Sequence, residues 1–330
     1  MLPGPYERWF TEACGRPAPV ERRSTCDACA MLPGAPDLPP DGPFDEAVRC
    51  CTYHPHLAPH FVGAILDGGE GLSDAGRAIV RARIAARAGV TPIGLAPAPE
   101  FAAAYQRIAA EPGAFGRRRE LACPFYDGGR CAIWRQRGVA CAAFHCKFDR
   151  GALDVAVWNL IVVGFNAVER VLARRLLERH GLDAAACDAL LHAPGDDALD
   201  ARAWGEWRGR EEDYFVAAAR AVEPLSWADV EALGGRALAG LAEALRAAMA
   251  RLDEAPPERV RRGGEILHHL GRAGGARLEH RGLPLDLVDV SAEVAARLAA
   301  LGEARLADLH LDEALARRLL DWQVLVPAGS

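Results

Sequence analysis

Cysteine spacing constrains this chain more than any other feature of its sequence. Eight of the ten cysteines fall into two groups, and no cysteine lies between the groups. The first group is Cys26, Cys29, Cys50 and Cys51, and the second is Cys123, Cys131, Cys141 and Cys146. Thiolates gathered in this way typically hold a metal ion or an iron–sulfur cluster. We therefore expect the first 150 residues to fold around a bound inorganic centre.

Composition restricts the class of protein and its location. The chain has 330 residues, about half of them apolar, and a net charge of −6, which gives no general attraction to nucleic acid or to anionic membranes. The apolar run 156–165 is too short to span a bilayer, and the first residues do not have the pattern of a signal peptide. We expect a cytoplasmic protein without nucleic-acid or membrane partners. Thiols stay reduced in that compartment, so dense cysteines indicate metal before disulfides.

The first cysteine group contains a C-x-x-C knuckle and an adjacent pair. In Cys26-Asp-Ala-Cys29 the two intervening residues allow both sulfurs to face one ion. The redox version of this motif opens a helix after a strand, whereas these flanks are rich in proline and glycine. Neighbouring side chains of a strand point to opposite faces, so Cys50 and Cys51 leave three alternatives. The backbone turns sharply there, the thiols serve different sites, or one of them is simply buried.

The second cysteine group lies in a region expected to be irregular. Cys123 to Cys131 reads as a hairpin with a three-residue loop around Asp127, in which Gly128-Gly129 supplies the positive-φ positions and Cys123 lies across from Cys131. Cys141 and Cys146 are five residues apart, so a continuous helix would place them on different faces. We expect a loop or a helix end there, with His145 as a further candidate ligand.

The remainder of the chain is dominated by helical periodicity, so the predicted fold class is mainly α. Helices are predicted over 73–88, 99–110, 153–180, 182–193, 210–222 and 226–253. Ser73 and Ser226 are candidate N-caps, the second with Asp229 as a capping-box partner. The predicted division is a cysteine-cluster metal-binding domain at 1–150, a helical domain at 151–255 and a C-terminal module at 256–330.

The C-terminal module changes character after Pro256-Pro257. We expect two short strands at 277–280 and 283–290 around a glycine-containing turn, helices at about 292–302 and 311–321, and an apolar end at 324–326. His268 and His269 fall in what reads as a helical segment, where adjacent residues face different directions. A small winged-helix-like module and an extension of the helical core are both consistent with this pattern.

The order of these motifs resembles a family of bacterial zinc- or iron-chelating cysteine-cluster proteins (YkgJ-like). The matching stations are Cys26-x-x-Cys29, Cys50-Cys51, Cys123-Pro-Phe125, Cys131-Ala-Ile-Trp134, Arg137-Gly-Val-Ala-Cys141 and Phe144. The resemblance covers residues 24–148 and implies metal binding through the eight clustered cysteines. This sequence departs from the family pattern in three respects: the long spacing from Cys29 to Cys50, Gly138 in place of proline, and Trp134 in place of tyrosine.

These observations leave several functions open. Eight thiolates could fill two Cys₄ zinc sites or one [4Fe–4S] site with four spare thiols, and the loop-borne spacing slightly favours the cluster. Some protein-modifying enzymes, such as flagellin lysine methylases, carry a related pattern, so a methylase-like enzyme acting on a peptide or protein is one alternative. A zinc-stapled interaction module without catalysis is another. The sequence contains no P-loop, dinucleotide fingerprint, nucleophile elbow or HExxH motif, so no catalytic residue is assigned.

Three further groups of residues have simpler interpretations. His54, His56 and His60 follow the Cys50-Cys51 pair and are candidates to bind or tune a metal, although solvated histidines of a proline-rich surface loop are the expected alternative. Cys187 has the spacing of a helix core residue, and Cys14 gives no signal.

Overall fold

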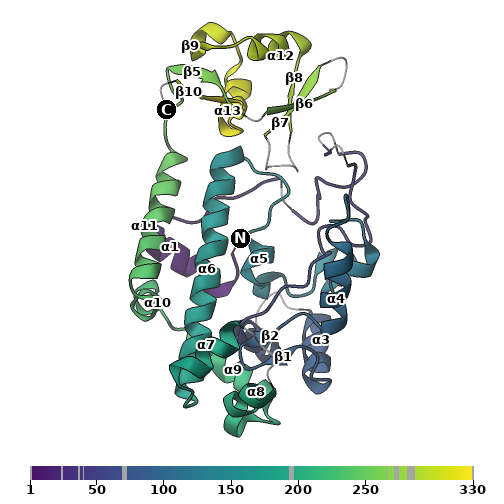
Figure 1. Cartoon of the computed structure of the whole chain (residues 1–330), viewed down its shortest axis with the longest axis vertical. Helices are drawn as coiled ribbons and strands as arrows, with labels where there is room; N and C mark the ends of the chain where they lie inside the picture. The colour runs from purple at the N-terminus through teal and green to yellow at the C-terminus, as the bar shows by residue number, and fades with distance from the viewer. Residues whose placement is uncertain are drawn as a thin grey trace. The chain divides into compact units, whose positions relative to one another are not determined.

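The computed structural model describes residues 2–23, 25–35, 38–39, 41–68, 73–192, 197–264, 266–270, 275–280 and 287–328. In these residues the chain is mainly α-helical, as the sequence predicts (Figure 1). Tertiary contacts divide it into two units built from non-consecutive segments. Unit 1 comprises Met1–Ala18, Phe44–Phe144 and Leu160–Leu245, and unit 2 comprises Pro19–Pro43, His145–Asn159 and Arg246–Ser330. The domain boundaries at 150 and 255 remain predictions.

Unit 1 holds most of the helices. They are α1 (Gly4–Cys14), α2 (Pro59–Asp67), α3 (Asp74–Ala85), α4 (Pro99–Ile108), α5 (Val139–Ala142), α7 (Ala184–His192), α8 (Asp197–Trp204), α9 (Glu211–Val222) and α10 (Trp227–Gly234). Two longer helices, α6 (Gly151–Arg179) and α11 (Arg236–Arg251), contribute residues to both units. Unit 1 also contains two short hairpins, β1 (Val90–Thr91) with β2 (Gly94–Leu95) and β3 (Tyr126–Asp127) with β4 (Arg130–Cys131).

Capping residues explain where several predicted helices begin. The Ser73 hydroxyl accepts a hydrogen bond of 3.1 Å from the Gly76 backbone N–H and opens α3. Ser226 and Asp229 form the predicted capping box of α10. The single helix predicted at 226–253 is wrong, because Gly235 takes a φ of +56° and separates α10 from α11. An L side chain rarely adopts that conformation, which makes glycine the natural breaking point.

The core of unit 1 depends on close helix packing. A Cβ atom added to Gly63 on α2 would lie 1.8 Å from the Phe215 carbonyl oxygen of α9, so only glycine permits this approach. Helix α1, which the sequence did not predict, buries Tyr6, Trp9 and Phe10. The Tyr6 ring stacks on Phe165 of α6 with ring centroids 4.3 Å apart. The apolar face of α1 thus joins the same core.

Unit 2 combines two small antiparallel sheets with two helices. One sheet has the order β10 (Leu325–Pro327), β5 (Arg259–Arg262) and β9 (Glu303–Arg305), and the other β6 (Ile266–Leu270), β7 (Ala276–His280) and β8 (Val288–Val290). Helices α12 (Ala292–Ala299) and α13 (Glu313–Asp321) confirm the predicted pair. An apolar cluster that includes Leu278, Leu319 and Trp322 forms the core.

The predictions for this part of the chain were partly correct. Strands β7 and β8 pair as expected, although part of the predicted 283–290 strand and its turn lie outside the described residues. The helical interpretation of His268 and His269 is wrong, because both lie in β6 and pair with Leu278 and Arg277 of β7. Cross-strand pairing therefore overrides the local helical pattern.

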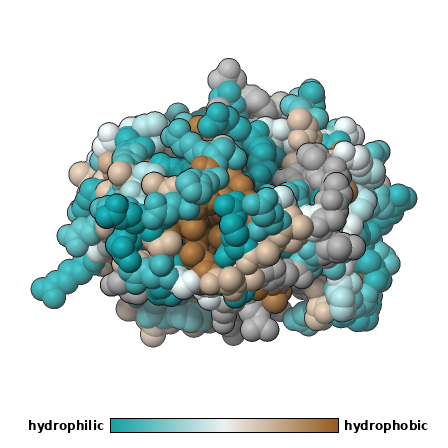
Figure 2. Space-filling view, turned by 90° about the horizontal axis from the view of Figure 1, so that it is seen from above, coloured by the Kyte–Doolittle hydropathy of each residue, from teal (hydrophilic) through white to brown (hydrophobic). Residues whose placement is uncertain are grey.

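Hydrophobic residues are concentrated on one area of the surface and along one long helix. The face seen in Figure 2 is mostly hydrophilic, with a hydrophobic area near its centre. Among the described residues, one helix, α6, is long and apolar enough to cross a membrane by length and composition alone, and 44% of its most apolar window is buried in the protein. Core helices of soluble proteins pass the same test of length and composition.

Candidate metal centre

The Cys50-Cys51 pair lies at a sharp turn. Residues 46–50 form turns, Arg49 adopts a φ of +50°, and the Cys51 backbone N–H donates to the Val48 carbonyl at 2.9 Å. This is the first of the three alternatives that the sequence left open. The turn lets two adjacent thiols lie on the same side of the chain, and interaction with Cys51, followed by burial, raises the pKa of Cys50.

The second group begins with the predicted hairpin, in a different register. Strands β3 and β4 are joined by Gly128 and Gly129, whose φ angles of +51° and +92° fit a two-residue turn. Cys131 pairs with Tyr126, so the expected three-residue loop and the pairing of Cys123 with Cys131 are wrong. The two glycines accommodate a tighter turn than the one predicted.

Three hydrogen bonds tie this hairpin to the turn that carries the first pair. The Cys123 backbone N–H donates to the Cys51 carbonyl at 2.8 Å. Arg49 donates to the Gly129 carbonyl at 3.0 Å, and the Tyr126 hydroxyl donates to the Glu46 carbonyl at 2.7 Å. Two segments that are about 70 residues apart in sequence are therefore held side by side.

Helix α5 brings a third segment to the same place. It ends at Ala142, so Cys141 lies within the helix and Cys146 beyond it, as predicted. The Arg137 guanidinium is buried, packs over the Trp134 ring at 3.6 Å, and donates to the Cys141 carbonyl at 3.4 Å. The pKa of Cys50 is raised, mainly by Cys51, and the pKa of Cys141 is raised, mainly by burial; the positive charge of Arg137 opposes a small part of each rise. Arg137 thus lies beside two thiols.

Electrostatic interactions show that five thiols from these segments lie near one another. We call them the unit 1 thiol group: Cys50, Cys51, Cys123, Cys131 and Cys141. Burial raises the pKa of Cys123 to about 12, with smaller contributions from Cys141 and Cys131. Burial likewise raises the pKa of Cys141 to about 12, followed by the effects of Cys131 and Cys50. Cys123 and Cys141 therefore resist ionisation unless a cation compensates their charge.

The unit 1 thiol group does not yet form a coordination sphere. Within the described residues, no three His, Cys, Asp or Glu side chains are arranged so that they could hold a metal ion, and no two cysteines form a disulfide. The donor set nevertheless suits zinc or an iron–sulfur cluster, because the side chains are sulfur donors and a buried arginine accompanies them. The residues present therefore fit such a centre by chemistry.

The other three predicted ligands belong to unit 2. Cys26 and Cys29 lie in a segment of turns, in which the Leu32 backbone N–H donates to the Cys29 carbonyl at 3.3 Å. Arg23 donates to the Phe148 carbonyl at 3.4 Å, and Arg22 forms an ion pair with Asp149 at 3.0 Å. These bonds hold the chain before Cys26 alongside the chain after Cys146.

The histidines differ in how far they are buried. His60 is buried and its Nε2 lies 3.3 Å from the Tyr6 hydroxyl oxygen, while burial lowers its pKa to about 3. His54 stacks on Phe101, with its Nε2 2.8 Å from the Ala122 carbonyl oxygen. His145 packs edge-on against Trp158 at 4.3 Å. The expectation of solvated histidines is therefore wrong for the buried His60.

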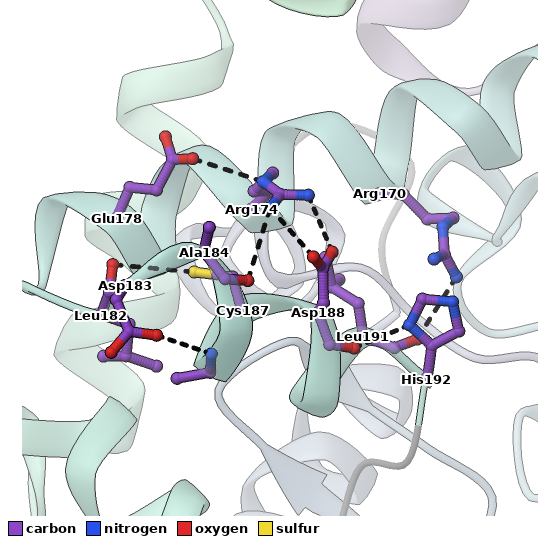
Figure 3. A network of polar contacts seen from close by, with 11 residues as sticks. Arg170, Arg174, Glu178, Leu182, Asp183, Ala184, Cys187, Asp188, Leu191 and His192 are labelled. Atoms are coloured by element: carbon purple, nitrogen blue, oxygen red, sulfur yellow. Dashed lines mark hydrogen bonds and ion pairs between the residues drawn. The ribbon is translucent and has the colours of Figure 1, made fainter.

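Cys187 lies in the core, as its helical spacing predicts. It is completely buried on α7, and its sulfur approaches the Leu182 carbonyl oxygen at 3.9 Å. Figure 3 shows this thiol among hydrogen-bonded groups of α6 and α7, in which Arg174 forms ion pairs with Glu178 and Asp188. Cys14 is the last residue of α1. Neither thiol belongs to the unit 1 thiol group.

Three polar groups inside the protein, two buried and one half-buried, were missed at the sequence level. Lys147 follows Cys146 in the sequence and is fully buried. It is the one lysine of the sequence, and this could have marked it as a residue with a special environment. Glu169 lies four residues after Phe165, in the apolar stripe of α6, where a carboxylate is unusual. Glu21 is buried in unit 2, and no local pattern distinguishes it.

Comparisons with known proteins add no assignment. No family model matches the chain, and neither the curated proteins nor the solved structures that were searched contain a match.

Proposed function

We propose that this protein is a cytoplasmic metalloprotein whose unit 1 thiol group binds an iron–sulfur cluster or zinc. The observation that supports this proposal is the gathering of thiols from three distant segments. Cysteines that lie near one another are carried by three segments: the turn before Thr52, the hairpin at 123–131 and helix α5. Apolar packing alone would not require so many thiols together, whereas sulfur-ligated metals do.

The proposed ligand quartet is Cys123, Cys131, Cys141 and one thiol of the Cys50-Cys51 pair. Interactions link Cys141 with Cys131, Cys123 and Cys50, so these sulfurs share a neighbourhood. Their segments are turns, a two-residue hairpin and a one-turn helix, which can adjust to a coordination sphere. The family resemblance, with Cys26, Cys29 and Cys146 as further ligands, supports a second site in unit 2.

The finer fold assignment is also a proposal. The segments at 25–35, 44–53 and 121–146 would form an irregular cysteine-rich metal-binding region. The C-terminal residues would form a winged-helix-like module, which is supported by the order α12, β9, α13, β10 and by the pairing of both strands with β5. Such a module would suit binding of a peptide or protein, by analogy of fold alone.

The test is elemental analysis together with a visible spectrum of protein purified without oxygen. An iron–sulfur protein would contain iron and sulfide and be brown, whereas a zinc protein would be colourless. Cys123→Ser and Cys141→Ser should lose most of the metal, because serine replaces a thiolate ligand. Cys26→Ser should lose metal if the unit 2 thiols also bind.

Cys187→Ser is the matched control, because it makes the same substitution at a buried cysteine of α7 that lies outside the unit 1 thiol group. It should retain the wild-type metal content. The absence of both metals from wild-type protein, as purified and after anaerobic reconstitution, would overturn the proposal. Equal metal content in the Cys123 variant and the wild type would remove that residue from the ligand set.

A further inference from the structure

A pocket of about 390 Å³ lies in unit 1 beside the thiol group. Its walls come from the loop after Thr52, the β1–β2 turn and helices α5, α6 and α7. The apolar part of the lining is Ala58, Ile93, Val139, Ala173 and Leu191. The polar part is Tyr53, His56, Asn166, Glu169 and Arg170. A volume of this size that combines apolar walls with polar side chains is typical of pockets that bind small organic molecules.

One carboxyl group dominates the polar part of the pocket. Glu169 of α6 accepts a hydrogen bond of 2.8 Å from the Tyr6 hydroxyl and another from the Val139 backbone N–H. Both donors fix the carboxyl against the wall. Burial raises the pKa of Glu169 to about 7, against the opposing effect of these hydrogen bonds. A cation beside it would therefore be favourable, since it would replace the lost hydration of the carboxylate.

No other group of the pocket provides that cation in the interior. Burial lowers the pKa of His56 to about 4, so its imidazole is neutral at pH 7. Its buried Nε2 has no hydrogen-bond partner within the described residues and is available to a ligand. Arg170 lies at the exposed edge and donates to the Leu191 carbonyl at 3.3 Å (Figure 3). Water screens its charge there.

We propose that this pocket binds a small organic amine, with its hydrocarbon part on the apolar walls and its ammonium group facing Glu169. His56 would accept or donate a second hydrogen bond. Tyr53 and Ala140 also line the pocket and lie close in sequence to Cys51 and Cys141, so the amine would lie beside the thiol group. The proposal does not require a metal to be present.

The test is isothermal titration of the full-length protein with n-hexylamine, 1-hexanol and hexanoate at pH 7.5. The three probes share a hydrocarbon chain and differ in the charge of the head group. Hexylamine should bind at least about tenfold more tightly than hexanol, the difference expected of a charge-assisted hydrogen bond. Equal affinity for hexanol would show a merely apolar pocket, and preference for hexanoate would show that Arg170 governs binding. Either result would overturn the proposal.

Two variants locate the binding. Glu169→Gln should remove the preference for the amine, whereas Glu178→Gln, an exposed carboxyl on the same helix, should keep it. Ala173→Leu, which fills an apolar wall, should weaken hexylamine and hexanol together. Thermal unfolding of each variant checks the fold, and unchanged amine affinity in folded Glu169→Gln would contradict the proposal. Metal content measured on the same samples tests the metal centre separately.

Discussion

At the scale of single residues, unit 2 buries two carboxyl groups beside one another. Glu21 accepts hydrogen bonds from the Trp158 indole at 2.8 Å and from the Asp149 backbone N–H at 2.6 Å. Burial, and then the charge of Asp154, raises the pKa of Glu21 from about 4.5 to about 8. Glu21 therefore keeps its proton in the folded state at neutral pH and donates it toward Asp154.

This pair makes stability depend on pH. The folded state binds the Glu21 proton more tightly than the unfolded state, so the stabilisation is complete below pH 4.5 and is lost as pH rises to about 8. The slope is at most about 1.4 kcal/mol per pH unit. Glu21→Gln keeps an amide in place of the protonated carboxyl and should flatten this slope in urea unfolding between pH 5 and 8. A slope equal to that of the wild type would show that another group is responsible, and Glu178→Gln serves as the control.

The roles of single residues could be predicted where they depended on the residue type and on its spacing along the chain. The sequence indicated the eight clustered cysteines and the core position of Cys187, because both follow from local pattern. It could not indicate the neighbours of Cys123, whose backbone bonds to Cys51 across a long loop. The partner of Cys131 was also missed, because the turn closes on Gly128 and Gly129 with two residues and shifts the register.

At the scale of elements, the approach of α2 to α9 depends on one glycine. Gly63→Ala would place a methyl group against the Phe215 carbonyl oxygen. Because that oxygen belongs to the backbone, the clash can be relieved only if one of the two helices moves. We expect a loss of about 1–3 kcal/mol in unfolding free energy. Gly240→Ala is the matched control, because this exposed glycine of α11 has open space around its Cα and should gain up to about 1 kcal/mol.

Denaturant unfolding of both variants measures the two effects. A Gly63→Ala protein as stable as the wild type would show that the two helices can separate without cost. Opposite signs for the same substitution at the two sites would separate the steric effect from helix propensity, because both residues lie inside α-helices.

Elements with strong end signals were predictable, and those stabilised by distant partners were not. Helices α3, α4, α6, α7 and α9 lie where periodicity and caps placed them. Helix α1 was missed because its apolar residues, Tyr6, Trp9 and Phe10, are spaced within a short proline-flanked segment. Strand β6 was missed because its conformation depends on pairing with β7. Short strands of two residues have too little sequence to give a pattern.

At the scale of the whole molecule, each unit is assembled from three separate segments. Local pattern carries no information on which segments associate, so the sequence suggested consecutive divisions. The eight predicted ligands fall five in unit 1 and three in unit 2, a distribution that differs from the two groups seen along the chain. In the folded chain, Cys50 and Cys51 share unit 1 with Cys123, Cys131 and Cys141, whereas Cys146 shares unit 2 with Cys26 and Cys29.

If unit 1 binds the proposed metal, the two units should respond differently to its removal. The segments that carry the unit 1 thiol group contain turns, a two-residue hairpin and the short α5, which offer little stability without a bound centre. The C-terminal part of unit 2 has its own apolar cluster around Val260, Leu278 and Trp322, which does not need metal. Chelation should therefore increase hydrogen exchange at 44–53 and 121–144 by a large factor and leave β5, β7 and α13 protected. Uniform loss of protection across both units would contradict a local role for the metal, and unchanged exchange at 121–144 would separate metal binding from the folding of that region.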